Sequence, residues 1–466
     1  MIRFYNSLTR QKEELVVKDN LVKMYSCGPT VYYYPHIGNF RAYVFMDLIK
    51  RTLLYNGYKV KNVMNITDVG HLTSDEDTGD DKMLVASKKE NKTPWEIAEF
   101  YTNYFFKDAE KLNILKPTIV AKATEHINEM IEFVKGLLEK GYAYELDDGI
   151  YFDVQKFKDY GKLSRVNLED KKAGARIEVN EKKHHPADFA LWIKAPKEHI
   201  MKWESPWGLG YPGWHIECSA MGRKYLGTHF QIHTGGIDHL TVHHENEIAQ
   251  NDALNGSPVV EKWMHVEFLQ VNGGKMGKSL NNLYRIEDLE EKGYSALDYR
   301  YFLLNTHYRK TINFTFDAIE SSKTALNRLI SVLYNHKNGK AKIEKSKLEE
   351  YKQKFLDAIN DDLNLPLAVG IVWDIVKNNE YSADIYNLII DFDKVLGLSL
   401  ERSVKEYKDI SSVEIEAPQE IKDLAEKRLQ AKKEKNYILA DSLRNEITEK
   451  GYSLIDTPQG YKINKL

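Results

Sequence analysis

Apolar residues recur along the chain with two periods, which predict an order of strands and helices. Lys23 to Tyr25 read as a short strand that runs into the glycine and proline of CGPT, and from about Asn39 apolar residues return at helical spacing. A second strand is predicted over YKVKNVMNIT, and THFQIHTGG and WMHVEFLQVNG read as strands far downstream. A strand, a helix and a second strand in succession are typical of a parallel sheet, so we expect one that is interrupted along the sequence.

The pattern becomes mostly helical in later segments. Between about residues 117 and 212, the helical HINEMIEFVKGLLEKGYAY, the strand GIYFDV and the loop SPWGLGYPGW indicate an insertion. From about Phe316 to Leu400 long amphipathic helices, such as ALNRLISVLYNH and LAVGIVWDIVKN, predict a bundle. A polar connector precedes one strong helix from Glu420, stopped by Gly451. The predicted fold class is α/β: a Rossmann-like parallel-sheet domain with an insertion, an α-helical bundle and a small C-terminal α/β tail domain.

Length, charge and cysteine count narrow the class of protein. A chain of 466 residues predicts several domains. It starts without a signal-peptide pattern and has no apolar run of the ~18 to 20 residues that span a bilayer, so we expect a soluble, cytoplasmic protein without membrane contacts. Cys27 and Cys218 are the only two cysteines, which predicts free thiols or metal ligands. The net charge of −3 decides nothing, because a nucleic-acid binder needs only a local basic face.

Two short motifs point to nucleotide chemistry only when they are taken together. HIGN at His36 to Asn39 stands beside a predicted helix start, where a histidine is usually a surface or capping residue. GGKMGKS at Gly273 to Ser279 is by itself typical of a solvated turn. Together they offer a helix N-terminus with an imidazole and two mobile lysines, which are the donors that triphosphate chemistry needs. Because the sequence has no GxxxxGK[ST] motif, we expect adenylyl rather than γ-phosphoryl transfer.

The stretch from Gly213 to Gln250 is rich in potential metal ligands. His243 and Glu247 are spaced i, i+4, so on a helix both point from one face. Thiolate, imidazole and carboxylate together fit zinc better than magnesium or calcium. The alternative is a polar helix start with Cys218 as a small buried hydrophobe, but both cysteines lie in motif-like stretches. The candidate ligands are Cys27, Cys218, His233, His243, His244, Glu245 and Glu247.

Taken in order over nearly the whole chain, these stretches resemble the cysteinyl-tRNA synthetases, a family of class I aminoacyl-tRNA synthetases. The matching motifs are CGPTVYYYPHIGN, NITDVGHLTSDEDTGDDKM, EKKHHPADFALW, GWHIECSAM, HTGGIDHLTVHHENEIAQ, KMGKS, DDLNLPLA and ADSLRNEITEKGYSLIDTPQG. The class I signatures are usually written HIGH and KMSKS, whereas this chain has Asn39 and Gly277 at the differing letters. The glycine keeps both lysines and adds freedom to the loop.

The resemblance implies an activity and a set of site residues. L-Cysteine would be activated by ATP to cysteinyl-adenylate and transferred to the 3′ end of tRNA(Cys). The implied ligands of one Zn²⁺ per chain are Cys27, Cys218, His243 and Glu247. Mg²⁺ would accompany the nucleotide. The implied ATP contacts are His36, Asn39, Gly235, Gly236, Asp238, Lys275, Lys278 and Ser279. Four of these residues would be catalytic: His36, Asn39, Lys275 and Lys278. The implied amino-acid pocket contains Gly28, Thr67 and Trp214.

A zinc ion explains why such an enzyme needs Cys27 beside its site of adenylation. A pocket sized for one small side chain separates close analogues by only ~1 to 3 kcal/mol. Zinc binds a thiolate and lowers the pKa of the thiol, whereas a serine hydroxyl competes poorly. Four protein ligands leave room for the substrate thiolate as a fifth. We therefore expect no separate editing domain.

The resemblance also implies the roles of the domains. The bundle and tail would contact tRNA, with Lys432, Asp441 and Asp456 at the anticodon. A basic helix face for this contact would be formed by Lys427, Arg428, Lys432, Lys433 and Lys435. The alternative is that these residues lie on an ordinary solvated surface helix. The expected domains are a Rossmann-like catalytic domain (1–116 and 213–250), a connective insertion (117–212), a KMSKS-loop and stem-contact region (251–315), a helix bundle (316–400) and an anticodon-binding tail (417–466). We expect a monomer.

Two alternatives share part of this sequence pattern. A cysteine ligase that acts on an amino sugar has the same catalytic domain and zinc site, but it ends without an anticodon-binding tail. The stretch AEKRLQAKKEKNYILADSLRNEITEKGYSLIDTPQG therefore favours the synthetase. A catalytically inactive tRNA-binding paralogue should have lost ligands or loop lysines, and this chain keeps all of them.

Overall fold

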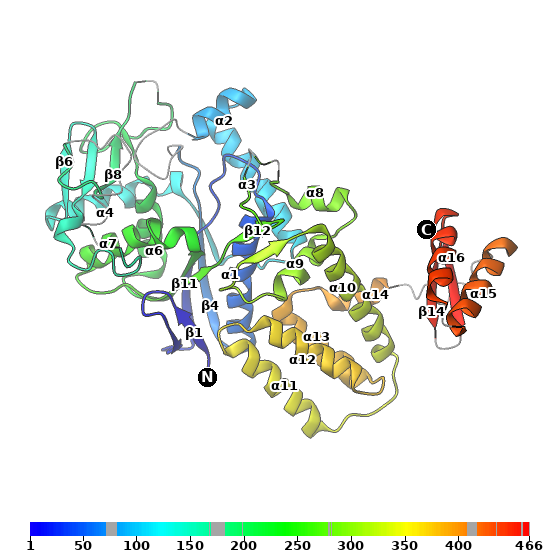
Figure 1. The fold of residues 1–466 in the computed structure, drawn as a ribbon. Coiled ribbons are helices and arrows are strands. Elements are labelled where there is room, and N and C mark those ends of the chain that lie inside the picture. Colours follow the sequence, from blue (N-terminus) through cyan, green and yellow to red (C-terminus); the bar gives the residue numbers. More distant parts are fainter. Residues whose placement is uncertain are drawn as a thin grey trace. The chain divides into compact units, whose positions relative to one another are not determined.

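A parallel sheet of five strands is the centre of the first part of the chain in the computed structural model (Figure 1). The structure describes residues 1–70, 82–166, 168, 182–197, 199–277, 280, 282–407, 417–434, 436–457 and 460–465. The strand order is β11-β10-β3-β4-β5, and all four pairings are parallel. The strands span β3 Leu21–Ser26, β4 Lys59–Ile66, β5 Ile119–Lys122, β10 Phe230–Gly236 and β11 Val260–Val266. The expected interrupted parallel sheet is confirmed.

The order of strands reverses between β3 and β10, and this defines a binding crevice. From β3 the chain passes through helix α1 (Ile37–Tyr55) to β4 and later β5, whereas β10 returns on the other side of β3. In open α/β sheets, ligands bind outside the carboxyl ends of the strands at such a switch point. Cys27 directly follows β3, and its backbone N–H donates to the carbonyl of Thr234 in β10 (3.1 Å). Cys27 therefore lies at the expected position of a site.

An antiparallel sheet is inserted between β5 and β10. It contains β6 Ala143–Leu146, β7 Gly149–Phe152, β8 Phe189–Lys194 and β9 Gly210–Pro212, in the order β6-β7-β8-β9. Helices α4 (Ile127–Glu139) and α6 (Trp214–Leu226) pack against it, and α7 (His243–Asn255) packs against both helices. Cys27 and Cys218 belong to the apolar core formed with these elements. β5 and β11 are strands of the parallel sheet, although the sequence-based boundaries put them in the insertion and in the following region.

The stretch WMHVEFLQVNG forms two strands instead of one. β11 ends at Val266, and β12 (Leu269–Val271) pairs with β13 (Ile312–Phe314) in a separate parallel sheet. The backbone between them turns at Glu267, whose N–H donates to the carbonyl of Tyr308 (2.9 Å). The apolar pattern continues across this break because both strands are buried, so the pattern could not reveal it.

Helices form most of the rest of the first part of the chain. The expected bundle is confirmed as α10 Phe316–Lys337, α11 Lys345–Asn360, α12 Leu365–Lys377 and α13 Ala383–Leu396. In Figure 1 the insertion and the bundle lie on opposite sides of the parallel sheet. The remaining elements are β1 Arg3–Asn6, β2 Gln11–Glu14, α2 Lys82–Glu90, α3 Pro94–Lys111, α8 Ile286–Glu291 and α9 Ala296–Leu304, and α14 Leu400–Glu406 continues into the second unit of the chain. No helix among the described residues is long and apolar enough to cross a membrane.

A buried arginine joins α1 to the bundle. Arg300 of α9 donates to Asp47 of α1 (2.6 Å) and to the carbonyl of Leu396 at the end of α13 (2.7 Å). Arg51 donates to the same carboxylate (2.7 Å). Tyr299, which precedes Arg300 in α9, donates a hydroxyl hydrogen bond to the carbonyl of Ile37, the first residue of α1 (2.7 Å). Helix α9 therefore fixes α1 at two points along its length.

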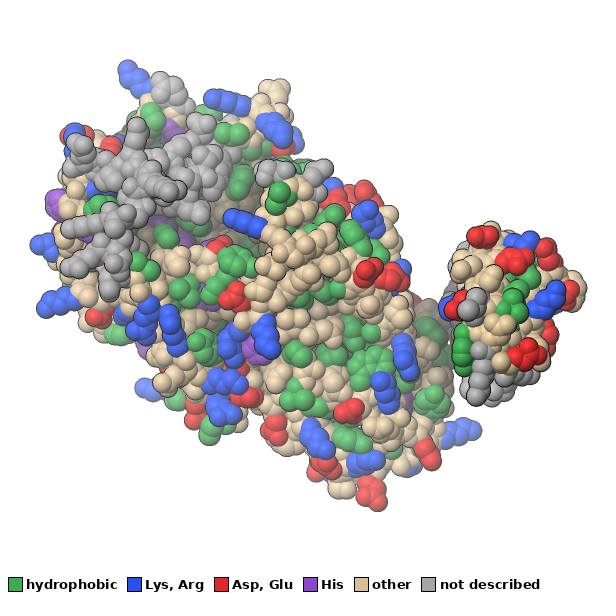
Figure 2. Space-filling view, in the orientation of Figure 1, with side chains coloured by type: hydrophobic (Ala, Val, Ile, Leu, Met, Phe, Trp, Pro, Cys, Tyr) green, Lys and Arg blue, Asp and Glu red, His purple; other side chains and the backbone are tan. Residues whose placement is uncertain are grey.

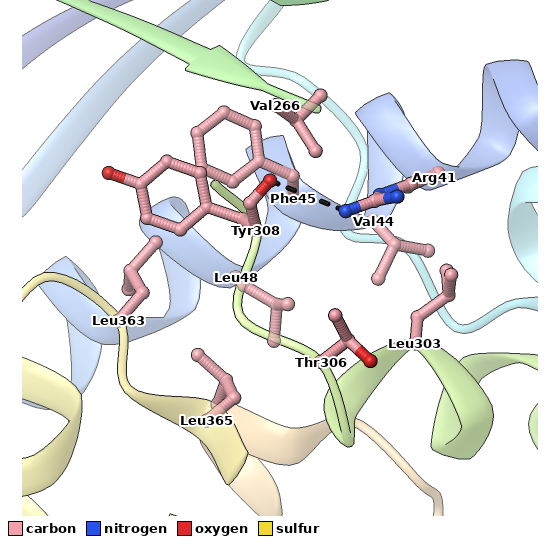
Figure 3. Close-up of a pocket in the computed structure, with 10 residues that line it drawn as sticks. All are labelled: Arg41, Val44, Phe45, Leu48, Val266, Leu303, Thr306, Tyr308, Leu363 and Leu365. Atoms are coloured by element: carbon pink, nitrogen blue, oxygen red, sulfur yellow. Dashed lines mark hydrogen bonds between the residues drawn. The ribbon is translucent and has the colours of Figure 1, made fainter. Parts of the chain in front are cut away.

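A small cavity of about 30 Å³ lies at the same junction (Figure 3). The side chains that line it come from α1, from the end of β11, from α9 and from the start of α12, and most of them are apolar. They are Arg41, Val44, Phe45, Leu48, Val266, Leu303, Thr306, Tyr308, Leu363 and Leu365. A volume that holds about one water molecule is too small for a substrate.

The tail forms a second compact unit, Arg402–Leu466. It contains α15 Gln419–Lys433, α16 Tyr437–Glu449, and the antiparallel pair β14 Tyr452–Thr457 and β15 Gly460–Lys465. The single helix expected from Glu420 to Gly451 is wrong, because α15 ends at Lys433 with Glu434 as its C-cap, and Asn436 caps a new helix by accepting from the N–H of Leu439 (3.2 Å). Gly451, with φ of 83°, does stop the second helix.

Candidate active site

Four buried ligand side chains meet at the crevice beside β3. Cys27 follows β3, Cys218 lies on α6, and His243 and Glu247 lie one turn apart on α7, so the predicted i, i+4 pair shares one helix face. The sulfurs of Cys27 and Cys218 are 4.0 Å apart, and the Cys218 sulfur is 3.6 Å from His243 Nε2. Glu247 Oε1 is 3.1 Å from that nitrogen and 4.0 Å from the Cys27 sulfur.

These distances fit a tetrahedral zinc ion. Zinc bonds of about 2.0 to 2.3 Å at tetrahedral angles place neighbouring ligand atoms about 3.4 to 3.8 Å apart. The four measured separations, 3.1 to 4.0 Å, bracket that range. Two thiols among the donors favour zinc over the oxygen-seeking magnesium and calcium. The donor set therefore matches zinc in chemistry and in spacing.

Further histidines support the same centre. His233 Nε2 lies 2.8 Å from Glu247 Oε2, and His215 Nδ1 lies 2.9 Å from His243 Nδ1. Each contact holds the far side of a ligand and leaves its other atom directed at the cluster, as partners of metal ligands do. His244 Nε2 also comes within 3.2 Å of the Cys27 sulfur, so Cys27, His233, His244 and Glu247 form a second, overlapping group that could hold a metal.

Glu245, the remaining candidate ligand, has a different role. Its buried carboxylate accepts from the backbone N–H groups of Gly161 (2.9 Å), Leu163 (3.0 Å) and Ser164 (2.7 Å) in the insertion. Neither group of potential metal ligands among the described residues includes it. Helix α7 therefore carries potential metal ligands on one face and anchors the insertion through Glu245.

Buried charges inside the cluster offset one another, while burial and the hydrogen bond with Cys218 hold the pKa of the Cys27 thiol well above its usual value. Burial opposes ionisation of Glu247, but the nearby His233 and His243 hold its pKa down at about 2. Burial likewise opposes protonation of His243, yet Cys218 and Glu247 raise its pKa to about 10. For Cys218 the raising effect of burial is outweighed by hydrogen bonds from Cys27 and His243, so its pKa is lowered. A metal cation would replace the proton on His243 as the counter-charge.

Glycines at the end of β10 make room for these rings. A Cβ on Gly235 would lie 2.6 Å from His244 and 2.7 Å from His239, and one on Gly236 would lie 2.3 Å from the carboxylate of Asp238. The ring of Trp214 packs 4.5 Å from that of His243. The structure thus brings the predicted GGID residues and Trp214 next to the metal cluster.

The predicted pocket residues Gly28 and Thr67 are joined by a side chain that sequence reasoning missed. The N–H of Gly28 donates to Asn65 Oδ1 (2.7 Å), and Asn65 Nδ2 donates to the Thr67 hydroxyl (3.0 Å). That hydroxyl donates to the buried carboxylate of Glu217 (2.7 Å), which was also missed. The only sequence signal was position, because Asn65 lies one residue before the end of an apolar strand and Glu217 directly precedes Cys218.

The HIGN motif caps α1. His36 Nδ1 accepts from the N–H of Asn39 (3.3 Å), while Asn39 Oδ1 accepts from the N–H of His36 (3.0 Å). This reciprocal pair is a capping box, and it explains why asparagine suits the fourth position. Burial lowers the pKa of His36 to about 4, so the ring is neutral at physiological pH. Because Nδ1 accepts, its proton is on Nε2.

The two nucleotide signatures lie together although about 240 residues separate them. A Cβ on Gly38 would stand 2.7 Å from the methyl carbon of Met276, within KMGKS. Asn282 holds the same loop by donating to the carbonyl of Lys275 (3.1 Å) and accepting from the N–H of Gly277 (2.9 Å). The side chain of Lys275 is exposed. Lys278 and Ser279, also predicted at this site, lie outside the described residues.

The tail gives a mixed result for the predicted basic face. Lys427 is exposed, but Arg428 is only 4% exposed, so it belongs to the interior of the tail and not to a solvated face. Asp441 is exposed and Lys432 is partly buried, while the side chains of Lys433 and Asp456 and all of Lys435 lie outside the described residues. On the bundle, Lys and Arg side chains alternate with Asp and Glu over the face drawn in Figure 2.

Known proteins resemble this chain in sequence over its full length. A family model described as the catalytic domain of tRNA synthetases class I (C) matches residues 13–324. The cysteine–tRNA ligase of Treponema denticola is 44% identical over 481 residues, covering 98% of each chain. That of Caldicellulosiruptor saccharolyticus is 42% identical and covers 100% of both. The match extends over the tail as well as the catalytic domain.

Solved structures show the same fold at low sequence identity. Mycobacterium tuberculosis methionyl-tRNA synthetase in complex with methionyl-adenylate is 14% identical, with a TM-score of 0.54 over 82% of this chain and 91% of that one. The ternary complex of Agrobacterium radiobacter K84 agnB2 LeuRS with tRNA and LeuAMS is 11% identical, with a TM-score of 0.61 over 84% and 85%. From the catalytic motifs to the tail, the chain belongs to the cysteinyl-tRNA synthetases, a family of class I aminoacyl-tRNA synthetases, and has the cysteine–tRNA ligase activity of that family.

Proposed function

We propose that a resident zinc ion selects L-cysteine in this ligase, whose substrates as a family member are cysteine, ATP and tRNA(Cys). Cys27, Cys218, His243 and Glu247 would hold one zinc per chain. The observation that carries this proposal is the convergence of four buried donor atoms at separations that fit tetrahedral zinc. When bound, the ion would supply a Lewis-acidic site that prefers a thiolate to the harder, less acidic hydroxyl of serine.

The first step forms cysteinyl-adenylate. The cysteine carboxylate attacks the α-phosphate of ATP and diphosphate leaves, so the enzyme must position two anions and stabilise the charge between them. We propose that His36 contributes through Nε2–H, since its neutral ring already uses Nδ1 within the capping box. The N-terminus of α1 adds the positive end of its dipole. The exposed amide of Asn39 is proposed to contact ATP from the same turn.

The KMGKS loop would supply mobile cations to the same step. Its Met276 lies beside Gly38 of the HIGN motif, which supports a phosphate contact for the nearby Lys275. Lys278 and Ser279 are proposed as contacts of the same phosphates, with Mg²⁺ accompanying ATP. Gly235, Gly236 and Asp238 are proposed for the nucleoside side, because the two glycines end β10 at the switch-point crevice and Asp238 lies in the turn directly after it.

In the second step, the terminal ribose hydroxyl of tRNA attacks the acyl carbon and AMP leaves, without a covalent enzyme intermediate. We propose that the tail reads the anticodon through Lys432, Asp441 and Asp456, and that the bundle contacts the inner tRNA elbow. Support for this assignment comes from the relatives, because their similarity includes the tail. The connective insertion and the region after β11 are proposed to contact the acceptor end. A cytoplasmic monomer completes the proposal.

Two histidine variants, one in the proposed site and one outside it, test the metal assignment. Metal analysis of protein expressed with ample zinc should find one zinc per chain, and His243→Ala should lose both this zinc and cysteine-dependent exchange of pyrophosphate into ATP. His229→Ala is the matched control, because His229 is exposed and pairs with Glu261 instead (2.8 Å). Sub-stoichiometric zinc in the unaltered protein, or unchanged cysteine activation in His243→Ala, would refute the proposal.

A further inference from the structure

Polar side chains from the end of β4, from the residue after it and from α6 form a hydrogen-bond chain beside the cluster of potential metal ligands. It runs from the N–H of Gly28 to Asn65, then to Thr67, and ends on Glu217. Asn65, Thr67 and Glu217 are 3%, 2% and 0% exposed. Gly28 follows Cys27 and Glu217 precedes Cys218, so both ends of the chain are next in sequence to proposed metal ligands. It therefore lies where the polar groups of a bound cysteine must go.

The direction of every hydrogen bond in this chain is fixed by its first member. A backbone N–H can only donate, so the Asn65 atom that faces Gly28 must be its oxygen. The Asn65 amide nitrogen is then the donor to Thr67, which occupies one lone pair of the hydroxyl. The Thr67 proton is therefore committed to Glu217. One lone pair remains on Thr67 Oγ1, and among the described residues no other donor reaches it.

The backbone gives this hydroxyl little freedom to turn elsewhere. The N–H of Thr67 donates to the carbonyl of Pro29 (3.0 Å), and the carbonyl of Thr67 accepts from the N–H of Val31 (3.2 Å). A Cβ on Gly28 would lie 1.7 Å from the carbonyl oxygen of Asn65, so the two segments can approach this closely only with glycine. Thr67 is thus a pre-oriented acceptor that cannot donate.

We propose that Glu217 and Asn65 are positioning residues that make Thr67 an acceptor for the α-ammonium group of cysteine. The inference rests on the proposed amino-acid pocket and states which end of the substrate Thr67 receives. A carboxylate needs a donor, and Thr67 has none left. The carboxylate of Glu217 behind the hydroxyl adds an attraction for a cation and a repulsion for an anion. The cysteine carboxylate must therefore point away from Thr67, toward ATP.

Three ligands separate the two ends of the substrate. L-Cysteine has both ends, cysteamine lacks the carboxylate, and 3-mercaptopropionate lacks the amine, while all three keep the thiol. Affinities are measured for the zinc-loaded full chain by calorimetry or by competition in pyrophosphate exchange. Thr67→Val should weaken cysteine and cysteamine by about 10- to 100-fold, the loss expected for one hydrogen bond to a charged group. It should leave 3-mercaptopropionate within about threefold.

Two more variants test the positioning residue and the hydroxyl itself. Glu217→Gln should show the same selective loss for amine-bearing ligands at a smaller size, about 3- to 10-fold, because a neutral amide attracts a cation less. Thr67→Ser keeps the hydroxyl and should restore affinities close to those of the unaltered protein. Zinc content of each variant checks that the cluster is intact, and Thr67→Val decides the proposal if Glu217→Gln fails to fold.

The outcomes separate this inference from the proposal on which it rests. Equal loss of all three ligands in Thr67→Val would show a merely structural role, and selective loss of 3-mercaptopropionate would show that Thr67 receives the carboxylate. Either result would overturn the inference, as would unchanged affinities in a folded Glu217→Gln. If the unaltered protein binds these thiols equally well with and without zinc, the proposed function fails instead.

Discussion

Arg300→Met should destabilise the catalytic part of the enzyme strongly, although Arg300 touches no substrate. The guanidinium is fully buried and donates to Asp47 (2.6 Å), to the carbonyl of Leu396 (2.7 Å) and to the carbonyl of Leu112 (3.0 Å). Methionine fills a similar length but donates nothing. The substitution therefore removes four hydrogen bonds at once from the junction of α1, α3 and α13, the longest of them to the carbonyl of Asn113 (3.5 Å).

The expected magnitude follows from this geometry. Each buried group that loses its partner costs about 1 to 3 kcal/mol, and removing one member of a buried ion pair costs about 3 to 5 kcal/mol. Asp47 keeps its second partner Arg51 (2.7 Å), so we expect the lower part of that range, about 3 to 4 kcal/mol. Unfolding entropy of about 2.1 cal/mol/K per residue over the unit Met1–Glu401 converts this loss into a Tm lower by about 4 °C.

Thermal unfolding followed by circular dichroism at one scan rate is the assay. Arg3→Met is the matched control, since Arg3 pairs with Asp361 at 3.2 Å while their side chains are 54% and 38% exposed. An exposed pair is worth about 0 to 1 kcal/mol, which predicts a change of about 1 °C or less. Equal Tm values for the two variants would refute the reasoning that burial makes the Arg300 pair important.

Three further results are expected. Burial raises the pKa of Asp108 to about 6 despite the nearby Lys111, so the ionised carboxyl lowers the stability of the fold above that pH. Asp108→Asn should therefore stabilise the protein at pH 8 by about 1 to 2 kcal/mol, and this gain should shrink toward pH 5. A difference in stability that does not change with pH would contradict this reasoning. Removing zinc by chelation should lower Tm, because the protein loses about 2.7 kcal/mol of stability if free zinc had been at 100 times its Kd. Cys27 and Cys218 should then react with a thiol reagent. An unchanged Tm would count against a bound metal. Truncation after Glu406 should leave cysteine-dependent pyrophosphate exchange close to intact while charging of tRNA falls steeply, and undiminished charging would show that the tail is not the anticodon reader.

Much of the fold and the metal cluster could be predicted because the signals were local or typical of the family. The helical period after His36 predicted α1, and the i, i+4 spacing of His243 and Glu247 placed them on one face of α7. The break between α15 and α16 could not be predicted, because apolar residues continue at helical spacing on both sides of it and the capping hydrogen bond from the N–H of Leu439 to Asn436 is a single local contact.

Other features depend on contacts between distant segments. The burial of Arg428 could not be read from its neighbours, because a cationic residue in a polar helix usually faces solvent. Asn65 and Glu217 looked like ordinary polar residues until β4 and α6 came together around Thr67. A hydrogen-bond chain across two elements leaves no periodic trace in the sequence.

Helix α7 links the metal centre to the insertion through Glu245. The proposed ligands His243 and Glu247 flank this residue, and its carboxylate accepts from three amides of one loop, those of Gly161, Leu163 and Ser164. Any loosening of the first turns of α7 on metal loss must weaken these bonds too. Hydrogen–deuterium exchange of the three amides would then accelerate in the zinc-free enzyme, so the order of a loop remote from the substrate would report whether the metal site is filled.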